Sequence, residues 1–171
     1  MARVDSSLLV ILPRIVARIQ SQVPELSNSG TCFLSLDPDV DPAPTPGGIW
    51  ATVGPADGMV DDSLVDGGGR NQVTFDGQFL VTVHSPVQLD EAGHDSEWLT
   101  NATLGVCKLM NDVLESLACY DLTDSNSGGS YVLRQSIFPA GYRVKPRGRS
   151  GQMGSIGIVF GMVWDQAFTT Y

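Results

Sequence analysis

Apolar residues recur at helical spacing in two segments of the chain. Between residues 8 and 19 they occupy one broad face, after candidate N-caps at residues 5–7 and before a stop at Pro24. Pro13 falls inside this pattern, where a proline removes a hydrogen bond, so the helix either kinks there or its regular part begins just before it. From Trp98 onward apolar residues again recur every three or four positions, which predicts one helix that runs to about Leu117.

Five other segments have the alternation or the short apolar runs that are typical of β-strands: 31–36, 49–53, 72–84, 131–138 and 154–164. Within the third, Asp76 and Gly77 either turn the chain as a hairpin or bulge one long strand. Residues 139–141 predict a break after the fourth. In the fifth, one face is formed by Ile156, Ile158, Phe160, Met162 and Trp164.

The order of these elements predicts an α+β fold, with an antiparallel or mixed sheet packed by two helices. The chain of 171 residues fits a single domain, and nothing in it repeats. Residues 37–71 form a long insertion between strands, rich in proline, aspartate and glycine, and its part from 54 to 71 reads as an acidic loop. Long loops of this kind are usually functional or disordered, so we expect an arm that orders against a partner.

Charge is scarce and unevenly distributed. Charged residues make up 17% of the chain, below the roughly 25% that is usual, and the net charge is −9. Residues 37–97 contain twelve acids and one base, whereas residues 134–149 contain five bases and no acid. Such segregation favours head-to-tail contacts between copies, although both segments could equally be solvated loops. The acidic balance disfavours general nucleic-acid binding, which needs a basic footprint.

The three cysteines cannot all pair, and none forms a CxxC motif. Cys107 and Cys119 have apolar neighbours in or near the second helix, so we expect buried thiols and a reducing compartment. The apolar run at residues 8–12 is too short to span a membrane and lacks the features of a signal peptide. We therefore expect no membrane association.

Candidate catalytic and metal sites are weak. Residues 37–41 resemble the first half of a calcium loop, but Pro42 stands where glycine is needed and Gly48 where a bidentate glutamate is needed. His84 and His94 lack further zinc ligands at suitable spacing. No serine lies in a G-x-S-x-G elbow, although a spatial Ser–His–Asp arrangement stays open. We expect no catalytic residue, no cofactor and no metal.

The order of elements is similar to that of one known family. The matching stretches are 8–19, 32–36, 73–84, 97–117, 131–138 and 155–163. Together they resemble the tail-terminator (tail-completion) proteins of long-tailed bacteriophages. The insertion at 37–71 and the basic arm near Arg147 exceed what the family leads one to expect.

The resemblance implies a structural virion protein and not an enzyme. It implies a homo-hexameric ring, assembled in the host cytoplasm, that caps the tail tube and contacts tail-tube and neck proteins, while genomic DNA passes through without specific binding. If the resemblance holds, the residues expected to contact other subunits or partner proteins are Arg143, Lys145, Arg147 and Arg149. The acidic candidates for a DNA-repelling lumen are Asp57, Asp61, Asp62 and Asp66. The alternatives are a neck or head-completion (connector) protein, a small hydrolase, a monomeric binding module, and bases that simply face water.

Overall fold

A computed structural model describes residues 7–35, 48–61, 72–87, 96–102, 105–120, 122, 131–144 and 153–167. Its elements are α1 (Ser7–Gln22), a 3-10 turn η1 (Pro24–Leu26), β1 (Cys32–Leu34), β2 (Trp50–Asp61), β3 (Gln72–Pro86), α2 (Ser96–Thr100), α3 (Val106–Leu117), β4 (Tyr131–Val144) and β5 (Met153–Ala167). The predicted fold class is confirmed: the structure is α+β, with a five-stranded mixed sheet and two main helices packed on it.

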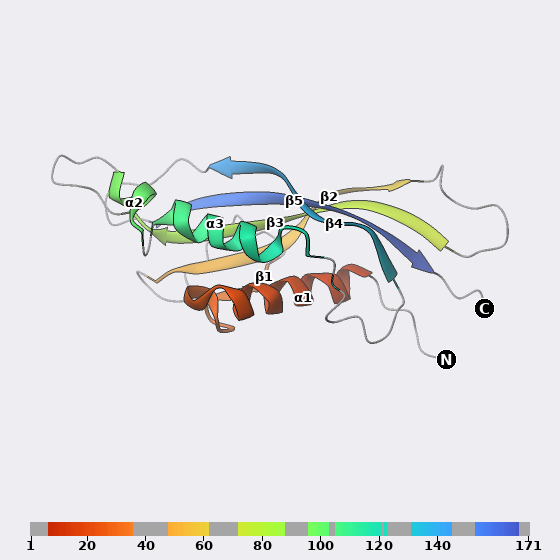
Figure 1. Ribbon diagram of the computed structural model, residues 1–171, viewed down its shortest axis with the longest axis horizontal. Coiled ribbons are helices and arrows are strands. Elements are labelled where there is room, and N and C mark those ends of the chain that lie inside the picture. Colours follow the sequence, from red (N-terminus) through yellow and green to blue (C-terminus); the bar gives the residue numbers. More distant parts are fainter. Residues whose placement is uncertain are drawn as a thin grey trace.

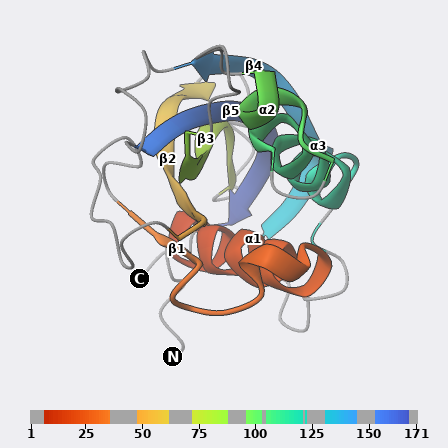
Figure 2. The ribbon, with the colours of Figure 1, turned by 90° about the vertical axis from the view of Figure 1, so that its left-hand side faces the viewer.

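The strands follow the order β1-β2-β3-β5-β4, so β1 and β4 are the two edges of the sheet. β1 runs parallel to β2, and every other neighbouring pair is antiparallel. β3 and β5 keep one register along their whole length and run along the long axis of the molecule (Figure 1). The sheet curls, and α1 and α3 lie together on one side of it (Figure 2).

The core lies between these helices and the near face of the sheet. The five β5 residues predicted to share a face are all buried. Phe160 stacks on Phe79 and Trp164 stacks on Phe75, each with ring centroids 5.2 Å apart. The helices supply buried aliphatic side chains at helical spacing, so burial of one stripe on each helix holds the two layers together.

The prediction of α1 is confirmed, whereas the prediction of one helix up to Leu117 is wrong. α1 continues through Pro13, whose side chain is exposed. The second helical pattern is divided between α2 and α3 by a turn at Gly105, whose N–H donates to the Asn101 carbonyl at 3.0 Å. A Cβ at Gly105 would lie 2.5 Å from that oxygen, so the turn needs glycine. The spacing of apolar residues continues from α2 into α3, because Trp98 and Val106 pack in the same buried cluster.

Two strands, β2 and β4, continue well past their predicted ends. β2 continues to Asp61, so the loop prediction is wrong for residues 54–61, while 62–71 lie outside the described residues. Its one bulge lies between Pro55 and Gly58, opposite β3, which runs straight through Asp76 and Gly77. β4 likewise continues through residues 139–141, where a break was predicted, with a register shift there. Proline is tolerated in β4 because an edge strand has one side without a neighbouring strand.

The expectation of buried thiols at Cys107 and Cys119 is also wrong, since both are exposed and the buried thiol is Cys32. Cys107 lies off the buried stripe of α3, and Cys119 follows the helix in the left-handed conformation, with φ of 61°. Burial raises the pKa of the Cys32 thiol to about 12, which keeps it protonated at neutral pH.

This arrangement predicts two classes of thiol. In the native protein Cys107 and Cys119 are expected to react with Ellman's reagent at neutral pH, and Cys32 only after unfolding, because the thiolate is the reactive form. Stopped-flow absorbance measures the two phases. The double variant C107S/C119S should lose the fast phase entirely. Three thiols reacting at one rate would contradict the buried position of Cys32.

Candidate assembly interface

Both edge strands carry an exposed apolar side chain. Among the side chains that the structure describes, the large apolar ones that are exposed are Leu34, at 47%, and Tyr142, at 75%. Leu34 ends β1 and Tyr142 lies near the end of β4. An apolar side chain on an open strand edge is a ready contact for another strand, so these edges are the candidate interface.

The edge of β4 is closed at one point and open beyond it. Ile137 donates its N–H to the Tyr120 carbonyl at 3.0 Å and accepts from the Cys119 N–H at 3.1 Å. The segment after α3 therefore covers the edge at Ile137. Residues 139–142 are exposed, and Pro139 has no N–H to donate. The stretch that can accept a partner thus begins after the proline.

The edge of β1 is also partly closed. The Cys32 N–H donates to the Asn28 carbonyl at 3.0 Å, and the Cys32 carbonyl accepts from Gln20 Nε2 at 2.9 Å. The Ser35 N–H donates to the Val53 carbonyl on β2 at 2.9 Å. Since backbone groups alternate in direction along a strand, those of Leu34 point away from β2, toward the open side.

Of the predicted basic residues, the structure places Arg143 only. It lies in β4 opposite Gly157 of β5, one residue after Tyr142. Lys145, Arg147 and Arg149 lie outside the described residues. In the sequence, the other three basic residues follow the end of β4.

Two of the four predicted acidic residues lie in the second half of β2. Asp57 lies within the β2 bulge and Asp61 ends β2 opposite Thr74, while Asp62 and Asp66 lie outside the described residues. The ends of β2 and β4 point in opposite directions along the long axis (Figure 1). Within one chain, then, the described acidic and basic positions do not meet.

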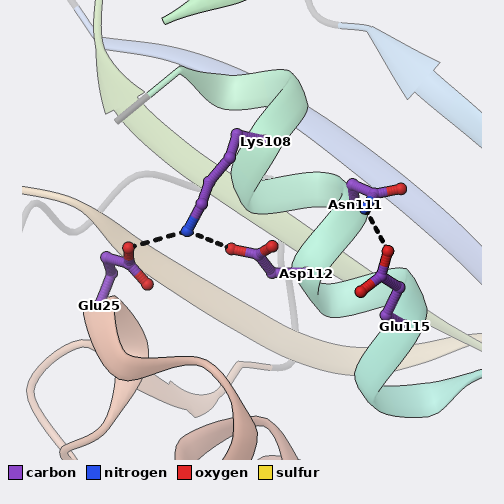
Figure 3. A network of polar contacts seen from close by, with 5 residues as sticks. All are labelled: Glu25, Lys108, Asn111, Asp112 and Glu115. Carbon is purple, nitrogen blue, oxygen red and sulfur yellow. Dashed lines mark hydrogen bonds and ion pairs between the residues drawn. The ribbon is translucent and has the colours of Figure 1, made fainter. Parts of the chain in front are cut away.

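The best-defined polar cluster joins α3 to η1. Lys108 Nζ lies 2.9 Å from Glu25 Oε1 and also forms an ion pair with Asp112 (Figure 3). The hydrogen bond from Lys108 lowers the pKa of Glu25 below its ordinary value of 4.5, against the opposing effect of burial. Hydrogen bonds to Asp112 and then Glu25 raise the pKa of Lys108. A carboxyl kept ionised in this way is a poor general acid, so the cluster fastens the helices.

The cluster makes stability dependent on acid. Because the pKa of Glu25 is lowered in the folded state, the ion pair stabilises the protein above about pH 4.5 and loses this effect as the pH falls through the folded-state pKa. The replacement K108M is expected to reduce the loss of unfolding free energy between neutral pH and about pH 3. The reduction should be less than about 1 kcal/mol, because the ion pair is partly solvated. Urea unfolding at neutral pH and near pH 3 measures it. Equal pH dependence in the two proteins would contradict the assignment.

A second polar group lies within the sheet. His84 stacks on Trp50, with ring centroids 4.9 Å apart, and lies opposite Ser155 on β5. All three side chains are buried. A serine nucleophile and its base must reach a substrate, so this burial favours a role in the core. His94 and the acidic segment 37–41 lie outside the described residues, and in the described part no group of three or more metal-binding side chains comes together.

Sequence reasoning did not single out Leu34 or Tyr142, because the residue pattern does not reveal which strands are edges.

No helix in the described parts of the chain is long and apolar enough to cross a membrane. The fold and its edges define a small α+β domain built on one open sheet. No protein-family model matches the chain, and no curated protein sequence matches it.

Proposed function

We propose that the chain is a structural virion protein that forms a ring at the head-proximal end of a phage tail, terminates tail-tube assembly and joins the tail to the head. The observation that carries the proposal is the exposed apolar group on each of the two opposite sheet edges, Leu34 and Tyr142. Two different surfaces on one chain associate head to tail, and such contacts close into rings when the rotation between copies is suitable. The similarity of element order to tail-terminator proteins supports the same assignment.

The charge distribution suits contacts beyond the ring. The basic run that begins at Arg143 and continues through Lys145, Arg147 and Arg149 would contact a neighbouring subunit, the tail tube or a neck protein. The acidic set Asp57, Asp61, Asp62 and Asp66 would line the lumen, where a negative wall repels phosphates and lets DNA pass without specific binding. A ring structure with these acids on the outer rim would remove the lumen assignment.

A neck or head-completion protein is the closest alternative, because it too forms a ring around a DNA channel. A small hydrolase would have to use a pair such as His84 and Ser155, and their burial disfavours this. A monomeric binding module would leave both sheet edges without a partner. The ring assignment therefore accounts for more of the described surface than these last two.

Light scattering at low and high salt tests the proposal. The expected mass is about six times the 18.3 kDa of one chain, with partial dissociation at high salt if the charged segments contribute. A mass of one chain at every salt concentration would contradict the proposal.

A further inference from the structure

The two exposed edge residues belong to one row that crosses the whole sheet. The strand registers align, in sheet order, Leu34, Val53, Val81, Ile158 and Tyr142. Directly paired residues project from the same face, so all five side chains lie on the helix-facing side. The three central residues are buried, and the two end residues are exposed because no described strand lies beyond them. The row is therefore a stripe of core residues whose two ends would be covered if a further strand were added at each edge.

The backbone of Tyr142 also faces outward. Ile137 already directs its N–H and C=O away from β5, so Phe138 faces Gly161 of β5. Because β5 keeps one register with β3, every second β5 residue from Gly161 faces β4. Tyr142 lies opposite Ile158, which falls between those positions, so the N–H and C=O of Tyr142 point to the open side. Leu34 has the same outward orientation on β1.

The strand directions allow the two edges to pair. β1 runs parallel to β2, and three antiparallel steps lead from β2 through β3 and β5 to β4. β1 and β4 are therefore antiparallel within one sheet. A second copy that continued the sheet would bring its β1 alongside β4 of the first in antiparallel orientation.

We infer that the ring is closed by this pairing, with Leu34 of one copy opposite Tyr142 of the next. The inference rests on the proposed ring and specifies its contact. Leu34 and Tyr142 would exchange two backbone hydrogen bonds, and their side chains would extend the core stripe from copy to copy. Arg143 would come opposite Phe33, so no like charges are opposed.

The shape of both edges favours a second copy over an unrelated peptide. Each open stretch is short: Asn28 and Gln20 occupy the backbone groups of Cys32, and the segment after α3 occupies those of Ile137. A long extended peptide would meet these closures. The two open stretches lie in the same row, so identical copies can continue the sheet through both open edges, and a head-to-tail contact of this kind closes into a ring when the rotation between copies is suitable.

Disulfide trapping in the full chain tests the inference. In a C107S/C119S background, L34C and Y142C are made separately, and each replaces an exposed side chain, so folding should be retained. A hydrogen-bonded antiparallel pair separates Cα atoms by about 5.5 Å, within the range of a disulfide. Under mild oxidation we expect a linked dimer in the mixture of the two variants and none above background in either alone. The L34C/Y142C double variant should give a ladder that ends at the ring size.

A140C serves as the register control. Ala140 is exposed but lies two residues from Tyr142, so its mixture with L34C should link far less. Linking of Y142C alone would show a two-fold contact between β4 edges and overturn the inference. If the mixture keeps the mass of a ring but forms no disulfide link, the inference is also overturned, whereas the proposed ring is retained. A parent protein with the mass of one chain would instead remove the ring, and the pairing with it.

Discussion

Replacing Phe160 with alanine is expected to lower the free energy of unfolding by about 3–5 kcal/mol. Phe160 is 0% exposed, lies on the central part of β5 and stacks on Phe79 across to β3. Truncation removes apolar burial and leaves a cavity that two long, fully paired strands cannot collapse to fill. Since small domains are stable by about 5–15 kcal/mol, the variant should be close to unfolding at ordinary temperature.

The matched control is Y142A, which removes an aromatic ring that is 75% exposed. At protein concentrations low enough to dissociate the proposed ring, its expected effect on the free energy of unfolding is within about 0.5 kcal/mol, as for other surface changes. Because the proposed ring would add concentration-dependent stability, urea unfolding should be followed at several protein concentrations. Equal losses in the two variants would show that Phe160 is not in the core or that Tyr142 is.

Replacing Gly77 with alanine is expected to cost about 1–3 kcal/mol, although it adds a single methyl group. A Cβ at Gly77 would lie 2.7 Å from two ring carbons of Trp164. The ring cannot retreat easily, because Trp164 is 3% exposed and stacks on Phe75. Because Gly77 has no side chain, it leaves space on β3 for Trp164, the largest side chain of β5.

G141A is the control for this prediction. Gly141 is exposed, lies in a strand as Gly77 does, and has no atom within 4 Å of the position of an added Cβ. Alanine there should be neutral or slightly stabilising, since glycine has the greater freedom in the unfolded chain. Thermal unfolding of both variants separates the effects. A neutral G77A would mean that Trp164 does not pack over β3 at this position.

Periodicity in the sequence predicts the parts of the fold that are locally determined. The buried face of β5 and the stripe of α1 could be predicted because burial on one side imposes a fixed spacing. The break at Gly105 could not, because it depends on a close approach to the Asn101 carbonyl while the apolar spacing continues across it. The passage of β4 through Pro139 could not either, since proline is tolerated there only because β4 is an edge.

Likewise, only part of the candidate interface could be predicted from the sequence. The sequence shows the basic run from Arg143 and the acidic run through Asp57, because charge is a property of composition. It does not show that Leu34 and Tyr142 share a row, which depends on four strand pairings between distant segments. Nor did the apolar neighbours of Cys107 predict its exposure, since they lie on the other side of α3.

Electron microscopy of the purified chain in negative stain shows directly whether the chain forms rings. We expect closed rings of about six copies with a central opening, and their loss in the variant Y142D, which places a charge on the open edge of β4. Particles that remain single domains at every concentration, or compact dimers without an opening, would contradict the proposed ring.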